Sequence, residues 1–262
     1  MTNSSLVEYV KISPNKTVNR NRSIDRITPH CVVGQVTVES LGNVFASTSR
    51  EASSNYGIGK DGRIGMYVEE KDRSWCSSSK ENDNRAVTIE VASDLAHPYA
   101  ITDAAYRSLV DLCYDICKRN GKSKLLWFND KDKTLSYSPK ENEMVITVHR
   151  WFANKACPGD YIYNRLGKIA DEVNSRLMIE DDKMKQEEFN TMFAVAMAEY
   201  RKERQDNDSS EYSEEARKWA VSNGIVNGTG EDGKFNGSWE DFITREQVVT
   251  MLYRFAKYID KE

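Results

Sequence analysis

Several features are scarce or missing in this chain of 262 residues. No run approaches the ~20 consecutive apolar residues of a membrane-spanning helix. The first thirty residues are polar, with no apolar stretch before a small-residue cleavage site, as a signal peptide would have. These absences argue against a membrane protein and against Sec-dependent export. The odd count of five cysteines argues against a disulfide scaffold, and no basic block is dense enough to indicate nucleic-acid binding.

The composition is that of a globular protein with a polar surface, because 39% of the residues are hydrophobic and 30% are charged. The charge is distributed unevenly. Residues 1–178 hold 25 Lys and Arg against 22 Asp and Glu, a net charge of +3, whereas the remainder holds 12 against 19, a net charge of −7. This asymmetry predicts two modules, with a boundary at the acidic run of residues 180–182.

The first module has the alternating pattern of an α/β domain. Strands are predicted at residues 24–33, 86–92 and 144–148, a hairpin at 56–67, and helices at 37–46, 102–120 and 161–177. The hairpin prediction depends on Asp61-Gly62, a favoured turn between two apolar runs. Thr102 is the expected N-cap of the clearest helix, and Gly121 is expected to end it.

The rest of the chain is predicted to be helical. Residues 179–210 are expected to form an acidic linker with a helix at 184–204, followed by a polar linker at 205–210. Residues 211–262 have the pattern of a small all-α module, a helix, a glycine-rich loop at 224–230 and a second helix. Ser213 is the expected cap of the first of these helices, and Thr244 with Gln247 forms a capping-box pattern for the second.

Only three histidines are present, and two of them end short stretches of strand-like sequence, residues 27–29 and 145–148. These are His30 and His149, and Cys157 follows eight residues after His149. Two imidazoles and one thiolate would make a three-ligand Zn²⁺ site with a fourth position for water, which is typical of catalytic zinc. The alternative is two separate strand-end histidines and a buried thiol. His97 is expected in a loop, away from the metal, and Cys31 is expected to point to the opposite face from His30.

Four segments in order resemble the motifs of type 2 N-acetylmuramoyl-L-alanine amidases, the superfamily of phage endolysins and peptidoglycan recognition proteins. Residues 149–159 (HRWFANKACPG) resemble its C-terminal zinc motif, and residues 27–30 (ITPH) its first zinc ligand. Residues 55–62 (NYGIGKDG) resemble its tyrosine-bearing hairpin, and residues 85–91 (RAVTIEV) its central strand. The resemblance implies a mixed central β-sheet flanked by helices over residues 1–178, with a mononuclear zinc site at one end of the sheet.

The resemblance also implies roles for five further residues. Tyr56 and Lys155 match positions that face the metal and stabilise the oxyanion, although Tyr56 could instead be a core aromatic and Lys155 a solvated cation. Glu90 matches a general base, or else a carboxylate that anchors a loop or a ligand histidine. Arg73 and Trp75 match a substrate-groove segment, with a Trp that covers the core as the alternative.

The C-terminal module resembles a single S-layer homology repeat at residues 215–228 and 243–248. In that family the matching segment contacts an anionic wall polymer, a role that would fall to Arg245. Such repeats usually occur in threes, so an acidic helical appendage without a ligand is the alternative. An apolar stripe of Phe189, Met192, Phe193 and Met197 on the preceding helix could pack on the module or on a second copy, which predicts a homo-oligomer.

These features together indicate a zinc-dependent endolysin that hydrolyses the bond between N-acetylmuramic acid and L-alanine in peptidoglycan. The alternative is a non-catalytic peptidoglycan recognition module. Members of that kind typically lose the cysteine ligand, and the presence of Cys157 favours the enzyme. Without a signal peptide, the expected location is the host cytoplasm before lysis, with a partner protein that opens the membrane, as for a phage or prophage of a Gram-positive host.

Overall fold

The structure is a computed structural model, and it describes residues 2–204, 209–228, 235, 237, 239 and 242–260. The chain forms two compact units, Met1–Asp182 and Lys183–Glu262. The boundary between them lies within one helix, α6 (Leu166–Arg204). Among the described helices, none combines the length and apolar composition that a membrane span requires.

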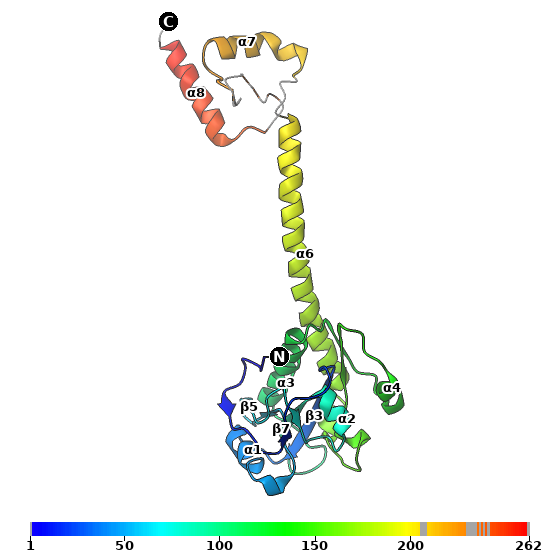
Figure 1. Cartoon of the computed structure of the whole chain (residues 1–262). Helices are drawn as coiled ribbons and strands as arrows, with labels where there is room; N and C mark the ends of the chain where they lie inside the picture. Colours follow the sequence, from blue (N-terminus) through cyan, green and yellow to red (C-terminus); the bar gives the residue numbers. More distant parts are fainter. Residues whose placement is uncertain are drawn as a thin grey trace. The chain divides into compact units, whose positions relative to one another are not determined.

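A seven-stranded sheet with the order β1-β5-β4-β7-β3-β9-β8 forms the centre of the first unit (Figure 1). Only β4 and β5 pair in antiparallel fashion, and the other neighbours are parallel, so the predicted mixed sheet is confirmed. Its strands are β1 (Tyr9–Val10), β3 (Arg26–Val33), β4 (Tyr56–Ile58), β5 (Ile64–Met66), β7 (Ala86–Ser93), β8 (Lys124–Leu126) and β9 (Glu143–Ile146). A separate antiparallel pair joins β2 (Lys16–Thr17) to β6 (Arg73–Ser74).

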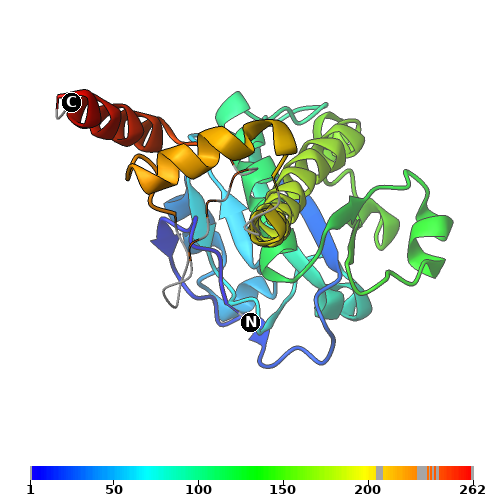
Figure 2. The same ribbon diagram turned by 90° about the horizontal axis from the view of Figure 1, so that it is seen from above.

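The helices of this unit are α1 (Val38–Val44), α2 (Lys80–Arg85), α3 (Asp103–Arg119), α4 (Lys131–Ser136), α5 (Gly159–Tyr163) and the first part of α6. Thr102 caps α3 as predicted, because its side chain accepts a hydrogen bond from the Ala105 amide. The segment that contains α4 extends at the β8 edge of the sheet (Figure 2).

The two faces of the sheet differ in chemistry, and the strand register shows which residues share a face. Ile89 of β7 lies opposite Tyr56 of β4, and both belong to the main apolar core that α3 and the start of α6 complete. Glu90 lies opposite His30 of β3 on the other face. That face is a buried polar layer, in which Asn82 of α2 donates a hydrogen bond to Thr28 and accepts one from Thr147.

Helix α6 is longer than the sequence predicted. The acidic run at residues 180–182 was expected to separate two helices, whereas α6 continues through it. The reason is local propensity, because residues 168–204 contain no Gly or Pro and are rich in good helix formers. Most of the expected polar linker, residues 205–208, and the end of the expected loop, residues 229–230, lie outside the described residues.

In the second unit, α7 (Glu214–Ser222) packs against α8 (Arg245–Ile259). The Trp219 ring lies 6.2 Å from the Phe255 ring and 5.5 Å from the Tyr258 ring, measured between centroids. The predicted capping box is present, since Thr244 and Gln247 exchange side-chain-to-backbone hydrogen bonds at the start of α8.

Candidate metal centre and active site

Three possible metal ligands come together at the carboxyl end of β3. His30 is the fifth residue of that strand. β9 pairs with β3 only through Val145 and Ile146, so the chain leaves the sheet there and turns into a short 3₁₀ helix that begins with His149. Parallel neighbours therefore bring these two histidines to the same end of the sheet, as the sequence predicted.

The loop that carries Cys157 is held by Arg150. The Arg150 guanidinium donates hydrogen bonds to the Ala156 carbonyl at 2.6 Å and to Asp160 at 2.9 Å. The backbone amide of Arg150 donates a further hydrogen bond to the Cys157 carbonyl. Gly159 closes the loop with φ +78°, where a Cβ atom would lie 2.7 Å from the Tyr99 Cβ. Only glycine fits this position, so the backbone beside Cys157 is tightly defined.

The donor atoms of His30, His149 and Cys157 all lie within 4.8 Å of one another. The His30 Nδ1 atom is 3.2 Å from the Cys157 Sγ atom, close to the ~3.5 Å that separates sulfur and nitrogen ligands on a tetrahedral zinc ion. The two imidazole centroids are 5.1 Å apart. The donor set is that of a catalytic zinc site, so the residues present fit this metal.

The protonation states of the two histidines also suit a metal, whereas burial raises the pKa of the Cys157 thiol. Burial lowers the pKa of His30 well below its ordinary value, and the neighbouring His149 lowers it further. Burial likewise lowers the pKa of His149, with a second contribution from the charge of Lys155. Both imidazoles are therefore neutral at pH 7, which is the form that binds metal. The Ser78 hydroxyl lies 2.9 Å from the His149 Nε2 atom. The Nδ1 atom of His149 is therefore the one left for the metal.

Glu90 adjoins this group. A carboxylate oxygen of Glu90 lies within 4.8 Å of the Cys76 sulfur and of a ring nitrogen of His30, which are equally close to each other. The Cys76 thiol is 3.7 Å from the Glu90 Oε1 atom. Desolvation raises the pKa of Glu90 to about 7. The other oxygen of Glu90 and the Nε2 atom of His30 are both buried without a hydrogen-bond partner among the described residues. Such a carboxylate can hold or release a proton near neutral pH.

Residues 20–160 match the N-acetylmuramoyl-L-alanine amidase family Amidase_2. The chain belongs to this family. Among curated proteins, none matches the sequence.

Solved structures with a related fold include an AmpD derivative, at 17% identity and a TM-score of 0.45, covering 65% of this chain and 99% of AmpD. The amidase LysC of Clostridium intestinale shares 16% identity with a TM-score of 0.43, covering 64% and 95% of the two chains. Drosophila peptidoglycan recognition protein SA shares 14% with a TM-score of 0.43, covering 60% and 90%.

Tyr56 does not join the candidate amidase site, which corrects the expectation drawn from the hairpin motif. It pairs with Ile89, whereas His30 pairs with Glu90, so Tyr56 points to the opposite face of the sheet. Its fully buried hydroxyl donates a 2.7 Å hydrogen bond to Glu70 and accepts one from the Ser4 amide. Tyr56 is thus the core aromatic that the sequence offered as the alternative.

Lys155 lies in the loop between the two C-terminal ligands, is exposed, and lies close enough to lower the pKa of His149.

His97 is an exposed histidine whose ring contacts Asp160 at 2.9 Å, and it is not among the three converging ligands. Cys31 is closer to the site than its strand face suggests, because a hydrogen bond from the Cys157 thiol lowers the pKa of Cys31.

Arg73 and Trp75 both contact Thr17 of β2, through the Arg73 Nη2 atom at 2.5 Å and the Trp75 indole nitrogen at 3.0 Å. The residues that alternate with them point inward, since Ser74 bonds Thr88 and Cys76 contacts Glu90. Sequence reasoning missed Cys76 and Ser78 as neighbours of the site. In the sequence the only indication of such a role was that both residues follow shortly after Arg73 and Trp75, the segment that resembles a substrate groove.

Proposed function

We propose that this chain is a zinc-dependent amidase that cleaves the bond between N-acetylmuramic acid and L-alanine in peptidoglycan. The observation that carries the proposal is the convergence of His30, His149 and Cys157 beside the carboxylate of Glu90. Bound zinc would lower the pKa of a coordinated water towards ~7 and polarise the scissile carbonyl.

The chain's own residues then have distinct tasks. Glu90, with its pKa of about 7, accepts a proton from the attacking water and returns it to the leaving amine nitrogen. Lys155 places a positive charge beside His149, where negative charge develops on the carbonyl oxygen. Thr28, Asn82 and Thr147 form the buried hydrogen-bonded layer that holds the strand ends beneath the ligands.

The test combines bond identity with metal content. Purified protein should release new L-alanine amino termini from peptidoglycan, contain about one zinc per chain, and lose activity with a chelator. His149→Ala should lose zinc, whereas the exposed His97→Ala should keep it as a matched control. Release of reducing sugar ends would overturn the amidase assignment. Wall binding without zinc and without hydrolysis would support a non-catalytic recognition module instead.

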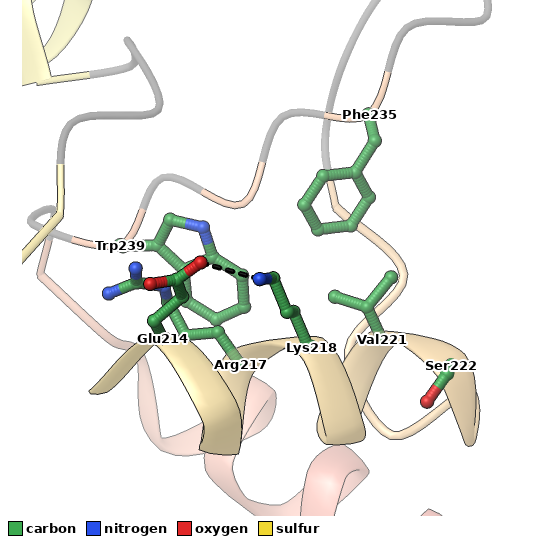
Figure 3. A pocket seen from close by; sticks show the side chains of 7 residues that line it. All are labelled: Glu214, Arg217, Lys218, Val221, Ser222, Phe235 and Trp239. Carbon is green, nitrogen blue, oxygen red and sulfur yellow. Dashed lines mark hydrogen bonds and ion pairs between the residues drawn. The ribbon is translucent and has the colours of Figure 1, made fainter. Parts of the chain in front are cut away.

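We further propose that the second unit binds an anionic wall polymer. Arg245 is exposed at the first residue of α8. A pocket of about 480 Å³ on α7 is lined by two aromatic rings, Phe235 and Trp239, together with Arg217 and the ion pair of Glu214 with Lys218 (Figure 3). Aromatic faces with cationic side chains suit an anionic saccharide. Co-sedimentation with walls stripped of their anionic polymers should show reduced binding, and unchanged binding would remove this role.

A role as an endolysin in host lysis is proposed with the same chemistry. Expression in a bacterium should cause rapid lysis only when a pore-forming protein or permeabilising agent opens the membrane. Lysis at the same rate without membrane opening would contradict this role and leave the amidase proposal intact.

A further inference from the structure

The loop of residues 76–79, which we call the serine loop, lies between β6 and α2 and contacts two residues of the candidate site. Its first residue, Cys76, places its thiol 3.7 Å from the Glu90 Oε1 atom. Its third residue, Ser78, places its hydroxyl 2.9 Å from the Nε2 atom of His149. The contact of Ser78 therefore involves the ring nitrogen of His149 that is not needed for the metal.

A buried carboxylate holds the serine loop in place. Asp83 of α2 is 2% exposed, and it accepts hydrogen bonds from the Cys76 amide at 3.0 Å and from the Ser77 hydroxyl at 2.6 Å. It also accepts one from the Ser77 amide at 3.2 Å. Ser79 ends the loop as the N-cap of α2, and its side chain accepts a hydrogen bond from the Asn82 amide. Because a shift of the loop would leave a buried carboxylate without its donors, the backbone of the serine loop is well fixed.

The same helix is tied to the segments that carry the two histidine ligands. The Asn82 side chain donates a hydrogen bond to the Thr28 hydroxyl at 3.0 Å and accepts one from the Thr147 hydroxyl at 2.9 Å. Thr28 lies two residues before His30, and Thr147 lies two residues before His149. Buried hydrogen bonds therefore set the position of the serine loop relative to both ligands.

The backbone of Ser78 has an unusual conformation. Its φ is +62°, in the left-handed region that glycine and asparagine adopt more readily than serine. Strain of this kind costs conformational free energy and persists where the surrounding structure imposes it, often beside functional sites. The hydroxyl of Ser78 is thus held against His149 at a position where backbone preference alone favours another residue.

We propose that Ser78 is a positioning residue for His149. Its hydroxyl oxygen accepts the Nε2–H proton, which keeps the lone pair of the Nδ1 atom free for the metal and fixes the orientation of the ring. Metal-binding histidines typically donate their second N–H group to an oxygen in this way. Ser78 is exposed, so it can donate its own hydroxyl proton to water while a lone pair on its oxygen receives the imidazole N–H.

The two histidine ligands differ in their need for such a contact. In the described part of the chain, the buried Nε2 atom of His30 has no hydrogen-bond partner, whereas that of His149 has Ser78. His30 is 0% exposed and lies within a strand, so packing and the sheet fix its ring. His149 is only partly buried and lies outside the sheet in a short 3₁₀ helix, so its orientation depends more on a hydrogen bond.

The proposal rests on the proposed metal site, and its first test asks which nitrogen of His149 carries the proton. Nitrogen-15 NMR of the full-length, zinc-loaded protein with labelled histidine distinguishes the two ring nitrogens, and His149→Ala identifies the signals of His149. The wild type should carry a proton on Nε2, and this proton should exchange with water faster in Ser78→Ala. A proton on Nδ1 with the metal on Nε2 would overturn the proposal.

The second test measures zinc affinity by competition with a chromophoric chelator. Ser78→Ala and Ser78→Gly should each bind zinc about 10–100-fold more weakly than the wild type. Glycine adopts the backbone of Ser78 without strain, so Ser78→Gly should unfold at the same or a higher temperature than the wild type, which separates loss of the hydroxyl from loss of the fold. Ser78→Asn tolerates the left-handed region and offers an oxygen acceptor, so it should recover part of the affinity.

Ser136→Ala is the matched control, because Ser136 is also exposed and its hydroxyl bonds carbonyls of its own helix, so this variant should bind zinc like the wild type. Unchanged affinity in both Ser78→Ala and Ser78→Gly would overturn the positioning role and leave the amidase proposal intact. A loss in Ser78→Ala that is absent in Ser78→Gly would also overturn it, since the backbone and not the hydroxyl would be responsible. A wild type that binds no zinc would instead contradict the metal site itself, so the two failures are distinguishable.

Discussion

Replacing Tyr56 by Phe separates a structural role from a catalytic one. The Tyr56 hydroxyl donates to the Glu70 Oε1 atom at 2.7 Å and accepts from the Ser4 amide at 2.9 Å, all in a buried site. Glu70 is only 1% exposed, although Arg119 still pairs with it at 2.6 Å. Tyr56→Phe therefore leaves one carboxylate oxygen short of a donor and one buried amide without its acceptor.

The magnitude follows from these two lost partners. A hydrogen bond to a charged group contributes about 1.5–3 kcal/mol, and an unpaired buried amide adds roughly 1 kcal/mol, so we expect a loss of about 2–4 kcal/mol in the free energy of unfolding. For a unit the size of Met1–Asp182, that corresponds to a fall in Tm of about 4–16 °C. The hydrolysis rate at 25 °C should stay close to that of the wild type, because Tyr56 faces away from His30.

Tyr67→Phe is the matched control. The Tyr67 hydroxyl is equally buried but donates only to the neutral Val38 carbonyl at 2.7 Å, so its loss should cost only about 0.5–1.5 kcal/mol. Urea titration and thermal unfolding measure stability, and clearing of purified walls measures activity. A hundredfold loss of activity in Tyr56→Phe with unchanged unfolding would refute the face assignment and restore a catalytic role for this tyrosine.

Three further predictions concern the site. Lys155→Ala should lower kcat by about 10²–10³-fold with little change in unfolding, and Lys155→Arg should recover part of it; full activity of the alanine variant would exclude oxyanion stabilisation by this residue. Glu90→Gln should lower activity about 10²–10⁴-fold. In chelator-treated protein the stability of the wild type relative to Glu90→Gln should fall in urea titrations as the pH rises from 4.5 to about 7, because folded Glu90 keeps its proton over that window while unfolded Glu90 has released it. The opposite contributions of His30 and His149, whose pKa values are lowered in the folded state, are common to both proteins and cancel in this comparison. Gly159→Ala should cost about 1–3 kcal/mol and weaken zinc binding measured by competition with a chromophoric chelator, because its Cβ would lie 2.7 Å from the Tyr99 Cβ; zinc affinity equal to the wild type would separate this glycine from the ligand loop.

The long elements of the first unit could be predicted from the sequence, and the short ones could not. β3, β7, the β4–β5 hairpin and α3 each carry several residues of regular pattern, and the structure contains all of them. β1, β2 and β6 have two residues each, and α2 and α4 have six, which is too few to show a period. The three short strands form because they find partners far away in the sequence, β1 beside β5 and β2 beside β6.

The same distinction applies to the site. His30 and His149 could be expected near one end of the sheet, because His30 lies in the second half of a recognisable strand and His149 follows another, and parallel neighbours end together. The position of Tyr56 could not be derived, because a shift of one residue in the register of β4 against β7 moves every side chain to the other face. Cys76 follows shortly after β6 and contacts Glu90. The pairing of β6 with β2 could not be predicted from the sequence near either strand.

The register has a consequence for where the oxyanion can be stabilised. On the face that carries His30 and Glu90, the β4 residue at the same level is Gly57, and a Cβ there would lie 2.6 Å from the Tyr67 ring. β4 therefore offers no side chain to the site at this level, since Gly57 has none and Tyr56 points into the core. Of the two groups that the family motif assigned to the oxyanion, Lys155 alone remains on the side of the metal ligands, close enough to affect His149. In the proposed mechanism the oxyanion is therefore stabilised by Lys155 and not by Tyr56, so the loss of activity in Lys155→Ala should be larger than that in Tyr56→Phe.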